Sequence, residues 1–304
     1  MTDTSVVIVA AARTPIGAFC GSLSSLKAHE LGSIVIKEVL HRSKVDPSEV
    51  DEVLLGQVLT AGQGQNPARQ AAVKAGIPFQ SSTACLINIL CGSGLKSIIS
   101  GYQAIRNGDS DIVVCGGMEV MSQAQHTSYL RSGIKIGNND LVDSLLHDGL
   151  TDAFHNIHMG ETAENVAKRY NITREEQDQA ALESQRRAEV AQKEGHFDKE
   201  IVPVTVRSRK EDVVVSKDEA PRHGITIQDL ARLKPAFIKN GTVTPGNASG
   251  ISDGAAAVVL MSADRAASRG LQSLGKIVAH SLEGVEPDVM GLGPIPAVKK
   301  VLLK

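Results

Sequence analysis

The chain has 304 residues, of which 42% are hydrophobic, and its formal net charge at pH 7 is −2. This length is sufficient for two modest domains, or for one large domain with an insertion. A charge so close to zero excludes a global field that attracts nucleic acid or an anionic membrane surface, so we expect neither partner. The longest apolar runs are too short to span a bilayer, and no charged leader precedes the first expected strand. The expected compartment is therefore the cytosol.

The four cysteines stand at positions 20, 85, 91 and 115, without Cys-x-x-Cys spacing. So few cysteines in so long a chain do not predict a disulfide framework, and their spacing is not that of a zinc site. We expect Cys20, Cys85 and Cys115 to be buried structural thiols. Three histidines and two aspartates gather in residues 147–158, but a cluster within one loop is more typical of a surface or a ligand contact than of a metal cage. We therefore predict no metal site.

Strand-like and helix-like segments alternate through the first 118 residues. Val6–Ala10 is apolar throughout, as is typical of a buried parallel strand. Asn66-Pro67 has the composition of a helix start, with an N-cap followed by proline at the first helical position. The remaining expected elements are a helix over 30–42, strands within 50–59, 84–90 and 111–115, and a helix that ends at Asn107-Gly108. This alternation predicts βαβ units and an α/β fold with a mainly parallel sheet.

Residues 119–248 are more polar, and we interpret them as an insertion into the first domain. Within them, Thr173-x-x-Glu176 is a capping box that opens a long charged helix. The predicted N-terminal domain comprises 1–118 and 249–270. Residues 271–304 contain one expected strand, at 276–280, and part of a helix from position 295. Because so small a piece cannot bury its own apolar faces, we expect a truncated second domain.

Cys91 is the strongest candidate for chemistry. It follows the apolar run 84–90, and Gly92-Ser93-Gly94 separate it from an amphipathic helix. The inner stripe of that helix is predicted to contain Leu95, Ile98, Ile99, Tyr102 and Ile105. At such a strand–helix elbow, the amide donors and the positive end of the helix dipole favour a thiolate, and the glycines let a ligand approach. This pattern favours a nucleophile, although a buried structural thiol remains the alternative.

The segment 88–96, Asn-Ile-Leu-Cys-Gly-Ser-Gly-Leu-Lys, resembles the active-site signature of the thiolases. The resemblance extends along the whole chain. Further matching segments lie at 11–15, 56–58, 64–70, 116–122, 221–224, 233–237 and 247–256. Residues 147–154 and 158–160 resemble the biosynthetic branch, the acetyl-CoA acetyltransferases, more than the long-chain degradative enzymes. This likeness implies the layered αβαβα thiolase fold with mainly parallel sheets, its second domain incomplete.

The resemblance also implies a reaction. Cys91 would attack the thioester carbonyl of acetyl-CoA, expel CoA and hold the acetyl group, with its own backbone amide as part of an oxyanion hole. A second acetyl-CoA would then condense with that acetyl group to give acetoacetyl-CoA. Coenzyme A and its thioesters would thus be substrates and products, with no tightly bound cofactor. The family is dimeric or tetrameric, which implies a homo-oligomer formed through the first domain and a loop near 123–138.

The residues expected at the coenzyme follow from the same likeness. His158 and Met159 would border the small acyl pocket, and Arg222 would lie near the ADP end, because guanidinium groups suit phosphate. The other expected contacts are Leu150 and Phe237 as apolar walls, Ala248, Ser249 and Gly250 along the pantetheine channel, and Met290 from the second domain. For Leu150 and Phe237, a purely structural place in the core remains the alternative.

The sequence departs from the family in one respect. It contains no Asn-Glu-Ala-Phe, Gly-His-Pro or Cys-x-Gly-Gly-Gly segment, so the histidine and the second cysteine that serve thiolases as base and acid are missing. We therefore expect the 304-residue chain alone to be impaired. Three alternatives remain open: a 3-ketoacyl-CoA thiolase for longer chains, a decarboxylating condensing enzyme of the same superfamily, and a truncated subunit without catalysis.

Overall fold

The computed structural model describes residues 5–304. The chain forms two compact units. The first, which we call the sheet unit, consists of Met1–Leu145, Glu200–Glu219 and Ser252–Val278. The second, the helical unit, consists of Leu146–Lys199, Ala220–Ile251 and Ala279–Lys304. These units cut the chain at other points than the domains expected above, and that division into domains stays a prediction.

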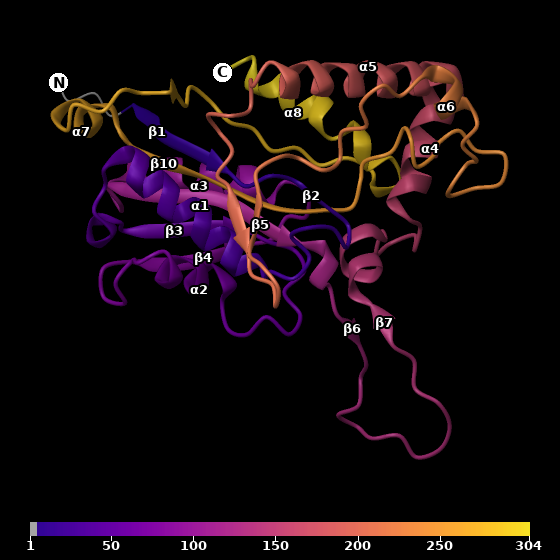
Figure 1. Cartoon of the computed structure of the whole chain (residues 1–304), viewed down its shortest axis with the longest axis horizontal. Coiled ribbons are helices and arrows are strands. Elements are labelled where there is room, and N and C mark those ends of the chain that lie inside the picture. The colour runs from indigo at the N-terminus through magenta and orange to yellow at the C-terminus, as the bar shows by residue number, and fades with distance from the viewer. Residues whose placement is uncertain (1–4) are drawn as a thin grey trace. The chain divides into compact units, whose positions relative to one another are not determined.

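The sheet unit is organised around a seven-stranded sheet in the order β11-β1-β10-β5-β3-β4, with β2 paired to β10 (Figure 1). The strands are β1 (Val6–Arg13), β2 (Gly17–Ala18), β3 (Glu52–Gly56), β4 (Thr83–Ile87), β5 (Ile112–Val120), β10 (Ser252–Ser262) and β11 (Gly275–Lys276). β3 pairs in parallel with β4 and with β5, whereas β10 is antiparallel to β1, β2 and β5, and β11 is antiparallel to β1. β1 to β5 therefore share one direction, and the prediction of a mainly parallel α/β sheet is confirmed.

The expectation that Val6–Ala10 pairs in parallel is wrong, because both neighbours of β1 are antiparallel. An apolar run indicates that a strand is buried on both faces, but it does not predict the direction of the neighbouring strand. β10 brings the chain back into the middle of the sheet from residue 252. The residues near β1 in the sequence do not predict this pairing, because β10 is distant in the chain. Similarly, the strand expected over 276–280 is reduced to Gly275–Lys276.

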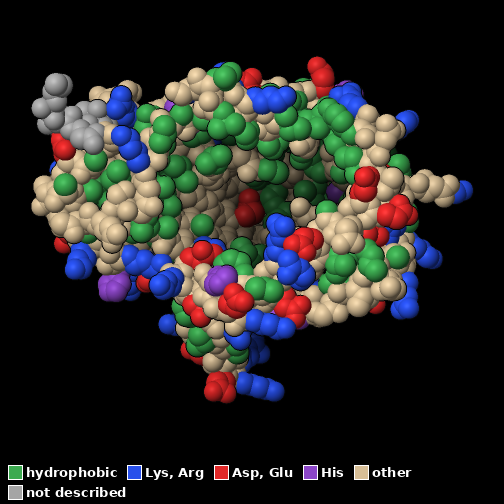
Figure 2. Space-filling model, turned by 90° about the horizontal axis from the view of Figure 1, so that it is seen from above, with side chains coloured by type: hydrophobic (Ala, Val, Ile, Leu, Met, Phe, Trp, Pro, Cys, Tyr) green, Lys and Arg blue, Asp and Glu red, His purple; other side chains and the backbone are tan. Residues whose placement is uncertain are grey.

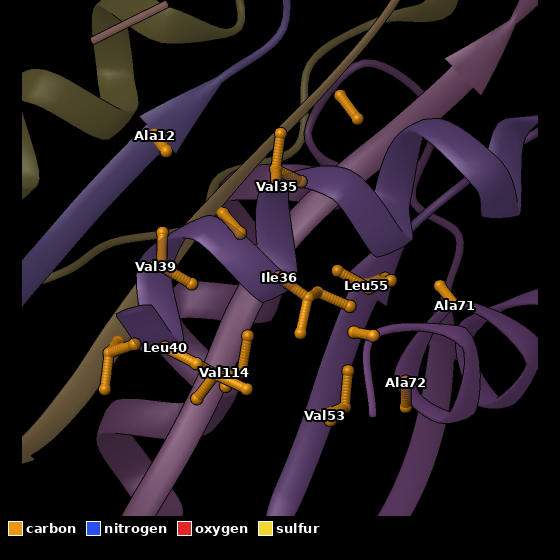
Figure 3. Packing of buried hydrophobic residues seen from close by; sticks show 14 of the residues in the cluster. Ala12, Val35, Ile36, Val39, Leu40, Val53, Leu55, Ala71, Ala72 and Val114 are labelled. Carbon is orange, nitrogen blue, oxygen red and sulfur yellow. The ribbon is translucent and has the colours of Figure 1, made fainter. Parts of the chain in front are cut away.

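Helices cover both faces of the sheet. On one face lie α1 (Ala28–Ser43) and α2 (Pro67–Lys74), whose apolar side chains pack against β3 and β5. Figure 3 shows Ile36 of α1 and Ala71 of α2 beside Val53 and Leu55 of β3. The next strand residue, Leu54, belongs to the separate cluster on the other face, with α3 (Ser93–Asn107). This alternation along β3 follows from the two-residue period of a strand, and it places α3 opposite α1.

The helix ends agree with the local sequence signals. The Asn66 side chain accepts a hydrogen bond from Arg69 N, which caps α2, and Gly108 ends α3 in the left-handed region with φ +81°. The predicted inner stripe of α3 is only partly correct. Ile99 is buried, but Leu95 is 65% exposed, and the most buried positions are the small residues Ser93, Ser97 and Gly101. Close packing on β5 selects small side chains there, which a count of apolar residues does not detect.

The helical unit contains two long helices, α4 (Met159–Tyr170) and α5 (Arg174–Lys193). The predicted capping box at the start of α5 is confirmed, since Thr173 and Glu176 each accept from the backbone N–H of the other. The smaller elements of this unit are α6 (Ile227–Ala231), the 3-10 segment η4 (Pro287–Leu292) and α8 (Pro294–Val301), while the π-helical turn η3 (Leu145–Leu150) begins at the end of the sheet unit.

The remaining short elements belong to the sheet unit. They are η1 (Pro47–Glu49), η2 (Met121–Gln123), β6 (His126–Thr127), β7 (Val142–Asp143), β8 (Val204–Val206), β9 (Val213–Val215) and α7 (Ala263–Ser268). On the face shown in Figure 2, acidic and basic side chains are interspersed, as the small net charge leads one to expect. Among residues 5–304, none of the helices combines the length and the apolar character that a membrane crossing requires.

Candidate active site

Cys91 lies at a strand–helix elbow and its side chain is exposed, as predicted for a nucleophile. The strand before it is shorter than expected. β4 ends at Ile87, and α3 begins at Ser93 with Gly92 as its N-cap. Leu90, immediately before the cysteine, has φ +55°, which is uncommon for a residue with a side chain. Such backbone strain persists only where surrounding contacts hold it in place, and it is found disproportionately at functional sites.

Hydrogen bonds within the elbow supply those contacts. Asn88 Oδ1 accepts from Leu90 N at 2.9 Å, which is an Asx turn. Ser93 Oγ accepts from Ile89 N at 2.9 Å and donates to the Leu90 carbonyl oxygen. The Asn and Ser of the signature segment thus have a local structural role, since together they hold the turn that presents Cys91.

Three glycines let the start of α3 settle directly on the sheet. A Cβ on Gly56, at the end of β3, would lie 2.5 Å from Gly94 N. A Cβ on Gly117 of β5 would lie 3.4 Å from the Gly94 Cα. One turn further along α3, Ser97 Oγ donates to the Gly116 carbonyl at 2.8 Å and accepts from Gly116 N at 2.9 Å. The position of Cys91 is therefore set by close contacts between backbone segments, which leave little freedom.

Two of the other three cysteines differ from expectation. Cys115 is buried in the sheet, as predicted, and burial raises the pKa of its thiol. Cys20 and Cys85, however, are exposed, so the prediction that they are buried structural thiols is wrong. Cys20 occupies a turn with φ +55°, and Cys85 lies on β4, the strand at the edge of the sheet. A residue on an edge strand has fewer neighbours to cover it, which the apolar run 84–90 did not reveal.

Glu119 is a titratable group that the sequence analysis did not single out. Its Oε2 accepts hydrogen bonds from Val58 N at 2.8 Å and from Leu59 N at 3.3 Å, in the loop after β3. Its Oε1 is buried without a partner among the described residues, 5–304. Burial outweighs these hydrogen bonds and raises the pKa of the Glu119 carboxyl to about 7. A glutamate inside the buried strand of residues 112–120 was the signal that could have revealed it.

In the helical unit, the structure brings two of the expected coenzyme residues together. The rings of His158 and Phe237 are stacked, with their centroids 4.7 Å apart and an angle of 21° between their planes. His158 caps α4 by accepting from Gly160 N through Nδ1 at 2.9 Å, and Met159 is the first residue of that helix. A Cβ on Gly160 would lie 2.2 Å from the Phe237 ring, so only glycine leaves room for this stacking.

The remaining expected residues lie on other segments of the helical unit. Leu150 ends the turn η3 and precedes Thr151, which forms an antiparallel bridge with His158. Ser249 and Gly250 are exposed and Ala248 is half-buried, in the loop before β10. The Arg222 side chain is exposed and takes part in none of the ion pairs found in residues 5–304, while its backbone N–H donates to Gln185 Oε1 at 2.7 Å. Met290 is partly exposed in η4, which Asn165 of α4 contacts by donating to the Asp288 carbonyl at 2.9 Å.

The side chains that commonly bind metals do not gather in the described part of the chain. In residues 5–304, no three histidine, cysteine, aspartate or glutamate side chains are placed to hold a metal ion together. Of the histidine cluster in 147–158, His155 pairs through Nδ1 with Asp152 Oδ2 at 2.9 Å, and His158 serves as the cap described above.

The comparisons with known proteins agree with this geometry. The model of the thiolase N-terminal domain matches residues 6–264, which include the elbow, β10 and the loop that precedes it. The chain belongs to the thiolase family. The match covers more than half of the chain and contains Cys91 at the position of the signature segment.

Curated relatives carry more specific names. A cytosolic acetyl-CoA acetyltransferase of Rattus norvegicus is 59% identical over 301 residues, which are 98% of this thiolase chain and 76% of that protein. An acetyl-CoA acetyltransferase of Rhizobium meliloti is 56% identical over 304 residues, 100% of this chain and 77% of the relative. The chain thus spans about three quarters of the length of these relatives.

The fold is shared with a solved relative. The crystal structure of the Bacillus anthracis acetyl-CoA acetyltransferase superposes with a TM-score of 0.95 at 45% identity, over 99% of this chain and 76% of that one. The layered thiolase architecture expected from the signature segment is thereby confirmed, and the chain represents part of it.

Proposed function

We propose that this thiolase chain is an acetyl-CoA C-acetyltransferase, in which Cys91 accepts the acetyl group. The observation that carries the proposal is the exposed thiol of Cys91 at a strained elbow directly before α3, in a chain 59% identical to a cytosolic acetyl-CoA acetyltransferase. A thiol in this position is suited to acyl transfer, because amide donors at a helix start stabilise negative charge on sulfur and on a carbonyl oxygen.

The chemistry proceeds in two stages. The Cys91 sulfur, as the thiolate, forms a bond to the carbonyl carbon of acetyl-CoA, and the oxygen takes up negative charge near the Cys91 amide. The bond to the CoA sulfur then breaks, and CoA leaves with the electron pair and takes up the proton that the Cys91 thiol gave up. A second acetyl-CoA gives a methyl proton to a general base, and its methyl carbon then bonds to the acetyl carbon while the bond to the Cys91 sulfur breaks and that sulfur takes the proton. The cysteine that serves thiolases as this acid and base has no counterpart in residues 1–304, so this is the stage in which we expect the chain alone to be impaired. This Claisen condensation gives acetoacetyl-CoA and frees the thiol, and the whole sequence is reversible.

CoA is bound, in this proposal, by the helical unit and serves as a substrate rather than as a resident cofactor. Phe237, stacked on His158, and Met159 border the acyl and pantetheine groups. Leu150 and Met290 add apolar surface, and the loop Ala248-Ser249-Gly250 lines the pantetheine. The exposed guanidinium of Arg222, which has no ion-pair partner among residues 5–304, interacts with phosphate at the ADP end.

Mass spectrometry of the purified chain tests the first stage. After incubation with acetyl-CoA, we expect one acetyl group on the peptide that contains Cys91 and none in the Cys91→Ala variant. Cys85→Ala, which removes another exposed thiol, is the matched control and should still be acetylated. Binding of acetyl-CoA without acetylation would instead favour a subunit without catalysis, and a faster reaction with palmitoyl-CoA would favour a thiolase for long chains.

The proposal includes a cytosolic homo-oligomer. A cytosolic relative is the support for the compartment. For assembly, the support is the segment between β6 and β7, which exposes several large apolar side chains. In a monomer these side chains would be exposed to water, which is unfavourable, whereas a second copy would bury them. They are Tyr129, Leu130, Ile134, Ile136 and Leu141. Analytical ultracentrifugation should find a dimer or tetramer, and a monomer at micromolar concentration would contradict this part.

A further inference from the structure

Glu164 is a buried carboxylate in the second turn of α4, only 7% exposed, that the proposed chemistry does not use. Its Oε1 accepts hydrogen bonds from Thr242 N and Val243 N, each at 2.7 Å. Its Oε2 accepts from Thr242 Oγ1 at 2.8 Å. One side chain of α4 therefore holds two successive residues of the loop that leads towards β10.

This arrangement is costly for stability alone. Glu164 takes part in none of the ion pairs found in residues 5–304. Burying a carboxylate without a cation costs free energy even when hydrogen bonds compensate it, and a glutamine could make a similar set of hydrogen bonds without the charge. What bears on the loop is therefore the set of hydrogen bonds that residue 164 makes, and not its charge.

The loop is shaped to receive this carboxylate. A Cβ on Gly241 would lie 2.3 Å from Glu164 Oε1, so any other residue there would push the carboxylate away. Glycine at 241 and glutamate at 164 therefore form a matched pair, in which the missing side chain of one makes room for the other. The contact between Gly241 and the Glu164 carboxylate is therefore a specific, buried one.

From Val243, hydrogen bonds lead to the stacked rings of Phe237 and His158. The Val243 carbonyl accepts from Ala236 N at 2.9 Å, and Ala236 precedes Phe237, whose ring stacks on His158. His158 is in turn the N-cap of α4, the helix that carries Glu164. Glu164 thus closes a ring of contacts that sets where Phe237 lies against His158.

From Thr242, a second set of hydrogen bonds leads to the segment Ala248-Ser249-Gly250. Asn247 Nδ2 donates to the Thr242 carbonyl at 3.1 Å and to Asp178 Oδ1 at 2.9 Å. Asn247 Oδ1 accepts from Thr244 N at 2.8 Å. Asp178, on α5, is itself held by Arg174 Nε at 2.7 Å. The residue before Ala248 is therefore anchored to the same loop that Glu164 holds.

We propose that Glu164 is a positioning residue for coenzyme A: by holding Thr242 and Val243 it fixes both Phe237 and the segment Ala248-Ser249-Gly250 in the geometry that receives the pantetheine chain. This inference rests on the proposed function for the identity of the ligand. A preformed site loses less conformational entropy when a ligand binds. Glu164 therefore increases the affinity for coenzyme A and does not change the reactivity of Cys91.

Four variants of the full chain test the proposal. E164A removes all three hydrogen bonds, and E164D keeps the charge but shortens the side chain by one methylene. E164Q keeps the length, so that its Oε1 accepts from both amides and its Nε2 donates to the Thr242 hydroxyl. E175A, an exposed glutamate at the start of α5, is the matched control.

Three measurements are made on each variant. Hydrogen–deuterium exchange of residues 242–250 should accelerate in E164A and E164D and stay near the wild-type rate in E164Q and E175A. CoA affinity, measured by calorimetry, should fall about tenfold or more in E164A and E164D and recover in E164Q. The rate at which iodoacetamide alkylates Cys91 without CoA should not change, which separates lost positioning from general unfolding.

Each outcome decides the question. Wild-type exchange rates in E164A, or wild-type CoA affinity together with faster exchange, would overturn the proposal. If E164A does not fold, the comparison of E164D with E164Q decides it, because both keep a polar group at the site. Failure of the wild-type chain itself to bind CoA would refute the proposed function for this chain. Exchange in residues 242–250 would still decide whether Glu164 holds the loop.

Discussion

Replacing Gly56 by alanine is the most direct test of how Cys91 is held. Gly56 does not have a positive φ, so alanine is compatible with its backbone, and the only penalty is steric. The new Cβ would lie 2.5 Å from Gly94 N and from the Ser93 carbonyl carbon, and 2.7 Å from Ser93 Cβ. Carbon atoms in contact prefer about 3.5–4 Å, so the start of α3 must move by roughly 1 Å.

That movement is opposed by neighbouring contacts. Ser97 ties α3 to both the N–H and the carbonyl of Gly116, at 2.9 and 2.8 Å. Alanine gains about 0.5–1 kcal/mol over glycine in a strand, whereas overpacking of this kind costs about 1–3 kcal/mol or more. We therefore expect G56A to lower the free energy of unfolding by about 1–2 kcal/mol. Urea denaturation measures this change.

The same displacement should alter the reactivity of Cys91. Moving its sulfur away from the helix start removes an interaction worth about 0.3–1 kcal/mol, which corresponds to a two- to fivefold slower alkylation by iodoacetamide. Gly275→Ala is the control, because a Cβ there meets nothing within 4 Å and the backbone does not need a positive φ. If G56A unfolds and reacts as the wild type does, the claim that backbone contacts place Cys91 is refuted.

Three further substitutions test other contacts. The folded-state pKa of Glu119, about 7, lies above its ordinary value of 4.5, so its contribution to stability is complete below about pH 4.5 and is lost as the pH rises through 7. Urea unfolding at pH 5 and pH 8 should show that E119Q reduces the difference in unfolding free energy between these two pH values by up to about 3 kcal/mol. An unchanged difference would mean that Glu119 is not the group whose titration causes it. G160A should force the ring of Phe237 away, because the added Cβ would lie 2.2 Å from it, and should weaken CoA binding measured by calorimetry with little effect on Cys91 alkylation. R269A removes the hydrogen bond that lowers the pKa of Glu49 to about 2, and with it a stabilisation that is present above about pH 4.5 and lost as the pH falls towards 2. This pair is partly exposed, so the change in thermal unfolding at pH 7 should correspond to at most about 1 kcal/mol, and a larger loss would show a tighter coupling.

Local signals predicted several helix ends in both units. The N-cap at Asn66, the left-handed end of α3 at Gly108 and the capping box at Thr173 were all found where the residue types indicated them. These features depend on neighbours three or four residues apart, and for that reason a sequence alone can reveal them. The elbow at Cys91 belongs to the same class, although β4 ends three residues earlier than its apolar run suggested.

The predictions that failed concern neighbours distant in the sequence. Cys85 was expected to be buried, yet β4 is an edge strand, and Leu95 was placed on an inner stripe that Ser97 and Gly101 occupy instead. Val6–Ala10 pairs with two antiparallel strands although its composition suggested a parallel neighbour. In each case, burial or pairing depends on which segment lies alongside, and hydrophobicity does not encode that partner.

The amino-acid sequence by itself determined the family, and it predicted the nucleophile and the segments expected to meet coenzyme A, because signature residues stand close together along the chain. Only the tertiary structure decided how those segments are held. Gly56 meets the helix start across 38 residues of sequence, and Glu164 reaches Val243 across 79. Such contacts form only when folding brings distant segments together. The effect of a missing Cβ or of a buried carboxylate then depends on the residue that it contacts, which the local sequence does not reveal.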